Sequence, residues 1–184
     1  MADANDRVNL GLGRREVRLV PHDPRWADAY QHEAERLRQA LGAHALEIAH
    51  IGSTAVPGLT AKPLLDIMVA ITSLGERDEV VPLLAQVGYE YRPHDTIPER
   101  LFFIAGEADA RRVNLSLAER DSAYWRDHLA FRDILRARPA VAEAYARLKA
   151  SLAEQYPDDR LAYTAAKGEF VARVLAAGDP ADRR

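Results

Sequence analysis

The segment 64–71, LLDIMVAI, constrains the fold of this chain most strongly, because it is apolar at every position except Asp66. A β-strand with one solvated face alternates between apolar and polar residues, whereas a nearly continuous apolar run indicates a strand buried on both faces. The sequence therefore predicts an α/β (α+β) fold class, with a β-sheet packed against helices. Asp66 is the exception, and an ionisable side chain there should be paired, bound to a metal, or placed at an exposed strand end.

The rest of the chain divides into a half with strand patterns and a half without them. Strands are expected at 17–19, 45–51, 64–71, 89–92, 101–105 and 111–117, with a hairpin turn at 106–110. Helices are expected from Asp23-Pro24 to Gly42, at 76–87, at 122–137, from Pro139 to Pro157, and at 159–177.

The length of 184 residues fits one domain and excludes two independently folded enzymes. Residues 1–15 show no periodicity and are expected to form a flexible leader. A single domain is expected over 16–177, with a sheet half at 16–117 and a helical half at 121–177, followed by a tail at 178–184.

The charges exclude some classes of protein. The 25 Lys and Arg residues are spread among 28 Asp and Glu, for a net charge of −3, which argues against a dedicated nucleic-acid binder but allows a local basic pocket. The absence of Cys excludes disulfides, thiolate zinc sites and thiol nucleophiles. The polar N-terminus and the lack of a long apolar stretch predict a cytoplasmic protein with no membrane partner.

The segment 50–66 holds the most unusual residues. A predicted strand runs into Gly52-Ser53-Thr54, where glycine allows close approach of a ligand and exposed amides and hydroxyls can hold phosphate oxygens. Lys62 adds a positive charge nearby. The alternative is that the glycine segment is a plain turn and that Asp66 caps neighbouring backbone. The density of unusual residues favours a site.

These residues, HIGSTAVPGLTAKPLLD at 50–66, resemble the signature of the GrpB family. The resemblance extends to VPHDPRW at 20–26, to Pro139 with YARLK at 145–149, and to DRLAYTAAK at 159–167, and so covers about 16–177.

The resemblance implies a nucleotidyltransferase-like fold, that of the DNA polymerase β palm, and some members of the family are fused to dephospho-coenzyme A kinase. In that superfamily a Gly-Ser turn grips a nucleotide triphosphate and carboxylates on the next strands bind two Mg²⁺ ions, which clamp the attacking and leaving oxygens. Carried over, Gly52 and Ser53 would form the phosphate turn and Asp66 would ligate Mg²⁺.

Two departures from the superfamily and family patterns bear on this expectation. Met68 stands two residues after Asp66, where a second metal-binding carboxylate is usual, and a thioether is a poor ligand for a hard cation. Asn114-Leu-Ser116 stands where GrpB-like proteins tend to have His-Leu-His. Glu47 and Glu99 are the remaining candidates for a second carboxylate.

Further candidates come from outside this segment. Arginines flanking the later strands, Arg100, Arg111 and Arg112, would meet an anionic substrate or simply be solvated. Asn114 and Ser116 would contact the substrate.

Tyr163 and Lys167 lie one helical turn apart and would line the pocket or lock the helical half onto the sheet. His50 would be a base, a ligand or a hydrogen-bonded structural residue. The other five histidines show no metal-site spacing.

Three functions stay open at this point. The first is a nucleotidyltransferase-like enzyme acting on a small nucleotide or phosphorylated metabolite, with Ser53, Thr54 and Lys62 on phosphate and Asp66 on Mg²⁺. The second is a catalytically degenerate module that binds such an anionic ligand. The third is a metal-free enzyme of specialised biosynthesis acting on a small polar metabolite, with His50 or Lys62 as the proton handler. The sequence decides neither the catalytic status nor the oligomeric state.

Overall fold

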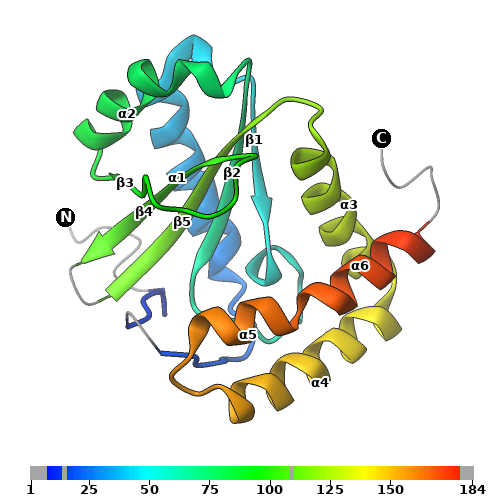
Figure 1. Cartoon of the computed structure of the whole chain (residues 1–184). Coiled ribbons are helices and arrows are strands. Elements are labelled where there is room, and N and C mark those ends of the chain that lie inside the picture. The colour runs from blue at the N-terminus through cyan, green and yellow to red at the C-terminus, as the bar shows by residue number, and fades with distance from the viewer. Residues whose placement is uncertain (1–7, 14–15, 108–109, 179–184) are drawn as a thin grey trace.

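The computed structural model describes residues 8–13, 16–107 and 110–178. Its centre is one sheet of five strands: β1 (Glu47–Ile51), β2 (Leu65–Ile71), β3 (Glu90–Tyr91), β4 (Leu101–Glu107) and β5 (Ala110–Glu119). The spatial order is β1-β2-β5-β4-β3 (Figure 1), with β2 and β5 parallel and the other neighbours antiparallel. The predicted α+β class, a mixed β-sheet packed with helices and followed by a C-terminal helical region, is confirmed.

Helices cover the two faces of this sheet in chain order. On one face lie α1 (Arg25–Leu41) and α2 (Arg77–Gln86). The other face carries α3 (Ala123–Ala137), and α4 (Pro139–Gln155), α5 (Arg160–Ala166) and α6 (Gly168–Ala177) pack beyond it (Figure 1). Short 3-10 turns complete the chain at Gly42–His44, Ser53–Ala55 and Leu74–Glu76. No helix in these described ranges is both long and apolar enough to cross a membrane.

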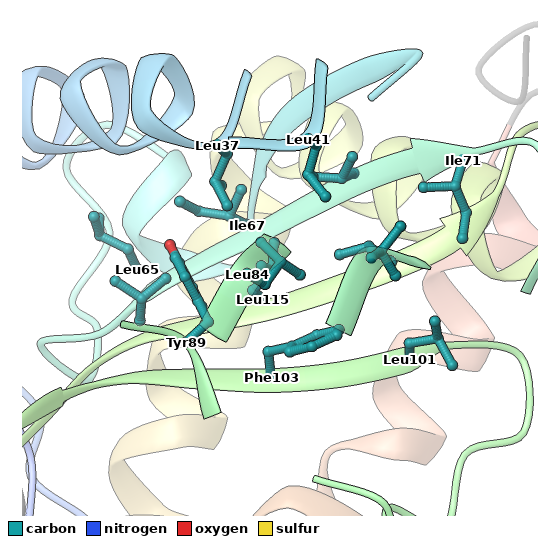
Figure 2. Close-up of a cluster of buried hydrophobic side chains, with 14 of the residues drawn as sticks. Leu37, Leu41, Leu65, Ile67, Ile71, Leu84, Tyr89, Leu101, Phe103 and Leu115 are labelled. Atoms are coloured by element: carbon teal, nitrogen blue, oxygen red, sulfur yellow. The ribbon is translucent and has the colours of Figure 1, made fainter. Parts of the chain in front are cut away.

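Strand β2 is buried on both faces, as its apolar run predicts. Leu65, Ile67 and Ile71 enter the cluster under α1 and α2, where Figure 2 shows them beside Leu37 and Phe103. The side chains that alternate with them, Met68 and Ala70, enter a second cluster with Trp125 of α3. Asp66 therefore points to the face covered by α3–α6, because side chains alternate along a strand.

Two of the expected elements differ from the structure. The short strand expected at 17–19 is wrong: Val17 donates its amide to Pro157 and packs near α4, and only Val20 forms an isolated bridge, with Ala61. The single helix expected at 159–177 is two helices that meet at Gly168, since glycine is a weak helix former.

The leader is only partly described. Residues 8–13 pack against the domain: the side chain of Leu12 is buried, and its backbone forms an antiparallel bridge with Arg111. Residues 1–7, 14–15 and 179–184 lie outside the described ranges, and so do most of the expected leader and tail.

Candidate functional site

A cavity of about 590 Å³ lies between the sheet and the helical half. Apart from the two candidate carboxylates Glu47 and Glu99, eleven of the thirteen candidate residues line it: Gly52, Ser53, Thr54, Lys62, Asp66, Arg100, Arg111, Asn114, Ser116, Tyr163 and Lys167. The parallel pairing of β2 with β5 brings the strand residues together, because it sets Asp66 beside Asn114 and Met68 beside Ser116. His50 and Arg112 do not line the cavity.

Gly52 is required by the turn that follows β1. Its φ of +70° with ψ of −172° is a conformation reserved almost entirely for glycine. A Cβ atom on Gly52 would lie 2.5 Å from Oδ2 of Asp66, so the backbone passes directly against the carboxylate. The glycine therefore places Ser53 and Asp66 in one wall of the cavity.

Asp66 is the first of three residues that are connected by side-chain hydrogen bonds. Its Oδ1 accepts a hydrogen bond of 2.8 Å from Nδ2 of Asn114, and Oδ1 of Asn114 accepts one of 3.2 Å from Nη1 of Arg111. The side-chain amide of Asn114 thus connects Asp66 to Arg111 by two hydrogen bonds, and it carries no charge of its own.

The donor set around Asp66 does not fit a pair of metal ions. Met68 has no exposed surface and packs in the apolar cluster with Trp125. Glu47 pairs with Ala70 at the other end of β2, and neither Glu47 nor Glu99 lines the cavity. Within the described residues, no group of three or more His, Asp or Glu is placed to hold a metal ion.

Positive charge dominates the cavity, although the whole chain has a net charge of −3. Its lining holds Lys62, Arg100, Arg111, Lys149, Arg160 and Lys167, against Asp66, Asp95 and Asp127. Asp95 is already paired with Arg100, whose Nε lies 2.7 Å from Oδ2 of the aspartate. An anion would therefore meet a surplus of cations here.

The pKa values of these cations report how closely they are packed. Burial, followed by the charge of Lys167, lowers the pKa of Lys62 to about 8. Burial and the neighbouring Arg160 lower the pKa of Arg111 to about 10. Burial also lowers the pKa of Lys167. A bound anion would raise these values, so protonation of the cations and anion binding favour each other.

Lys149 on α4 was not among the candidates from the sequence. The residue is only 2% exposed, and its Nζ donates to Oγ of Ser53 at 3.0 Å and to the carbonyl oxygen of Thr60. Burial, with the charges of Lys167 and Lys62, lowers its pKa to about 7. Its position four residues after Tyr145, on the apolar stripe of α4, is the signal that was available in the sequence.

His50 lies on the opposite face of the sheet and does not support the role of proton handler in the cavity. It stands opposite Ile67, so strand alternation turns its ring toward α1, where it stacks on Tyr30 at 4.6 Å between centroids. Burial lowers its pKa to about 3.

His50 instead holds the turn through Thr54. Its Nε2 lies 3.0 Å from Oγ1 of Thr54, which donates to the carbonyl oxygen of Leu64 at 3.2 Å. The neutral imidazole therefore donates from Nε2, and the hydroxyl of Thr54 is already engaged.

A β-bulge places Arg111 and Arg112 on opposite faces of the sheet, although both were expected to meet an anionic substrate or to be solvated. The register of β4 with β5 shifts between Ala105 and Gly106, so that Val113 stands opposite Ala105, Arg111 stands opposite Gly106, and Arg112 is the extra residue of the bulge. The extra residue reverses the alternation of side chains beyond it. Arg111 therefore faces the cavity with Asn114, while Arg112 lines a small hollow on the other side of the sheet.

The remaining candidates, Arg100, Ser116, Tyr163 and Lys167, contact other residues that line the cavity. Arg100 donates to Oγ of Ser116 at 3.1 Å and to the hydroxyl of Tyr124 at 3.0 Å. The ring of Tyr163 is near two ammonium groups, with Nζ of Lys62 at 5.2 Å and Nζ of Lys167 at 4.6 Å from its centroid. The aromatic face lessens the repulsion between these cations.

His128 also lines the cavity and was passed over in the sequence. Its Nδ1 donates to the carbonyl oxygen of Tyr124 at 2.8 Å, and burial lowers its pKa. His128 therefore contributes a neutral imidazole to the cavity wall. Its spacing from the other histidines did not indicate a site in the sequence.

Comparison with known proteins agrees with this fold over nearly the whole chain. The model of the family described as GrpB protein matches residues 16–177. A UPF0157 protein of Pseudomonas aeruginosa is 39% identical over 165 residues, which make up 86% of this chain and 66% of that protein. The glutamate-rich protein GrpB of Alkalihalophilus pseudofirmus is 34% identical over 90% of this chain and 98% of its own length.

A solved structure shows the same arrangement of elements. The crystal structure of conserved protein GrpB from Enterococcus faecalis superposes with a TM-score of 0.79 and 31% identity, over 86% of this chain and 95% of that one.

Proposed function

Since this chain belongs to the GrpB family, whose model spans residues 16–177, we propose that its cavity binds a small molecule with several negative charges, namely a nucleotide or a phosphorylated metabolite. One observation carries the proposal: the lining holds six Lys and Arg side chains against three Asp, in a chain with a net charge of −3. Cations crowded in a buried cavity repel one another, and a bound anion relieves that cost.

The size and shape of the cavity indicate more than a lone phosphate. A volume of about 590 Å³ lies within the range of about 300–1,000 Å³ that small-molecule sites occupy. Apolar lining from Phe131, Val171 and Leu175 supplies a surface for an organic group. The ligand would place its anionic part on the cations and its organic part on this wall.

Binding of this ligand does not require a metal pair. Asp66 accepts a hydrogen bond from Asn114. Its negative charge also interacts with cations of the lining, because it opposes the lowering of the pKa of Lys62 and of Arg160 that burial causes. Phosphate charge would be neutralised here by Lys and Arg, as it is in Arg and Lys clamps. The second candidate function is a Mg²⁺-dependent nucleotidyltransferase that uses Asp66, which the cavity-facing position of this carboxylate beside the Gly52-Ser53 turn favours.

Calorimetric titration with ATP and with inorganic pyrophosphate, in EDTA and in Mg²⁺, tests the proposal. We expect binding in EDTA and about tenfold weaker binding in Lys167→Met and in Arg160→Met, because each removes one charge-assisted contact of about 1.5 kcal/mol. Arg147→Met is the matched control, because Arg147 is an exposed cation on α4 outside the cavity. Absence of binding by both anions, or equal affinity in the lining variants and the control, would refute the proposal.

Asp66→Asn separates the two candidate functions. The asparagine keeps the acceptor for Asn114 but removes the negative charge, so anion affinity in EDTA should stay the same or increase. Affinity that needs Mg²⁺ and disappears in Asp66→Asn would favour the metal-dependent transferase.

A further inference from the structure

Ser53 and Lys149 form a pair that the binding of an anion does not explain. Nζ of Lys149 lies 3.0 Å from Oγ of Ser53, and the two residues are 96 positions apart in the chain. The side chain of Lys149 passes through the interior of the helical half, with its Nζ 4.9 Å from the ring centroid of Tyr145, and is almost fully buried. A lysine that only attracted anions would gain from solvent contact, whereas this one is buried and donates to the hydroxyl of Ser53 and to the carbonyl oxygen of Thr60.

The backbone around Ser53 makes a sharp turn from a strand into a helix, which places the serine at the wall of the cavity. Strand β1 ends at Ile51, Gly52 makes the turn with φ of +70°, and Ser53 opens a 3-10 helix at the cavity wall. A sharp strand-to-helix turn of this kind exposes a serine hydroxyl in hydrolases with an activated serine.

The surroundings of Lys149 favour the neutral amine. Besides burial, the ammonium groups of Lys62 from the β1–β2 loop and of Lys167 at the end of α5 oppose its charge. Tyr145 on its own helix faces it with an aromatic ring, and burial raises the pKa of that phenol. A neutral amine has two N–H groups and one lone pair. In the structure Nζ donates both to Oγ of Ser53 and to the carbonyl oxygen of Thr60. Rotation of the neutral amine about its C–N bond can keep the donation to Thr60 and turn the lone pair toward Ser53, which lets Nζ accept the hydroxyl proton.

We propose that Ser53 is a nucleophile and Lys149 its general base, and that the pair transfers a phosphoryl group from a phosphoanhydride held by the cations of the cavity. Serine–lysine pairs of this type activate serine without histidine. The choice of a phosphoanhydride as the substrate rests on the proposed function, whereas the assignment of Ser53 as nucleophile and Lys149 as base does not.

The step balances without a metal or a further reactant. Oγ of Ser53 attacks phosphorus and forms the Oγ–P bond, while the anhydride P–O bond breaks and its electron pair leaves with the departing phosphate. The hydroxyl proton passes to Nζ of Lys149. Water then attacks the phosphoserine, the Oγ–P bond breaks, Lys149 returns its proton to Oγ, and the water releases one proton to solvent. Arg and Lys side chains of the lining neutralise the charge on the phosphoryl oxygens.

An alkyl fluorophosphonate tests the pair, because it is a phosphorus electrophile that loses fluoride to an activated serine and carries no charge. We expect mass spectrometry to find the adduct on Ser53, with a labelling rate that increases about tenfold from pH 6 to pH 8, as one base with a pKa of about 7 requires. Ser53→Ala should remove this adduct, whereas Ser151→Ala, an exposed serine on α4, should not.

Two variants of Lys149 separate a base from a structural cation. Lys149→Arg keeps a charge and hydrogen-bond donors but accepts no proton, and Lys149→Met keeps the length of the side chain without either. Both should label at least about a hundredfold more slowly, which is the usual contribution of a general base, while Arg147→Met labels like the wild type. Should neither variant fold in a urea titration, the pH profile of the wild type decides.

Three outcomes would overturn the proposal: no label on Ser53 at pH 8, equal rates at pH 6 and pH 8, or normal labelling of Lys149→Arg. The neutral probe makes this result independent of anion binding. Wild type that binds ATP without being labelled would refute the nucleophile alone, and labelled protein that binds no anion would refute the proposed function alone.

Discussion

Gly52→Ala is the substitution whose cost the structure defines most sharply. The residue has φ of +70° and ψ of −172°, and an alanine in that region costs about 1–3 kcal/mol. The new Cβ would lie 2.5 Å from Oδ2 of Asp66, so the carboxylate must turn and weaken its bond with Asn114. Loss of a hydrogen bond to a charged group adds about 1.5 kcal/mol. We expect a total of about 3 kcal/mol.

Urea denaturation, with the slope of the transition compared between variants, measures this free energy of unfolding. In a chain of this length, about 3 kcal/mol corresponds to a fall in Tm of about 6–12 °C. Gly58→Ala is the matched control, because Gly58 also has a positive φ, +77°, but a Cβ there meets nothing within 4 Å. The control should lose only the backbone part of the cost.

A double-mutant cycle with Asp66→Ala isolates the contact. Removing the carboxylate should reduce the cost of Gly52→Ala by about 1–2 kcal/mol, as is usual for residues in direct contact. If Gly52→Ala costs no more than Gly58→Ala, or costs the same with and without Asp66, then the close approach of this turn to β2 is not what fixes the glycine.

Two further predictions concern the helical half and the buried lysine. Arg136→Met should lower the free energy of unfolding by about 1–2 kcal/mol in urea titrations, because its guanidinium donates twice, at 2.9 and 2.8 Å, to the carbonyl of the buried Ala55. The exposed Arg147→Met should change it by less than about 0.5 kcal/mol, and equal effects would contradict the role of this link. Burial lowers the pKa of Lys149 from 10.5 to about 7, so the unfolded chain binds more protons than the folded chain between these values. This group therefore makes stability increase with pH across that window, by at most about 1.4 kcal/mol per pH unit. Unfolding measured from pH 7 to 9 should show a smaller slope in Lys149→Met, and an identical slope would count against the neutral lysine.

The strand–turn–strand segment and its site residues were predictable because their signals are local. Asp66 stands out within an apolar strand, and Gly52 stands at the end of another, so both could be found without knowing their neighbours. The bulge that selects Arg111 over Arg112 depends on the pairing with β4, which no local pattern shows. The face occupied by His50 follows from its register with Ile67, which is likewise a property of the sheet.

Lys149 shows a different limit. A lysine on an amphipathic helix usually extends its amine into solvent, and the position of Lys149 on the apolar stripe of α4 does not show which group its amine would contact. Its contact with Ser53 exists only because α4 packs against the loop between β1 and β2. Residues that act through contacts across 96 positions of chain become visible only in the folded molecule.

The distribution of cations over the two halves of the chain affects how function can be transferred between relatives. Arg160 and Lys167 come from the last third of the sequence and Arg100 and Arg111 from the region of β4 and β5, whereas the motif at 50–66 supplies Lys62 alone. Two proteins that share the motif but differ in α4 and α5 would present different charge patterns to a ligand. Selectivity within such a group should therefore be inferred from the C-terminal helices, and a chimaera that exchanges them would exchange ligand preference with them.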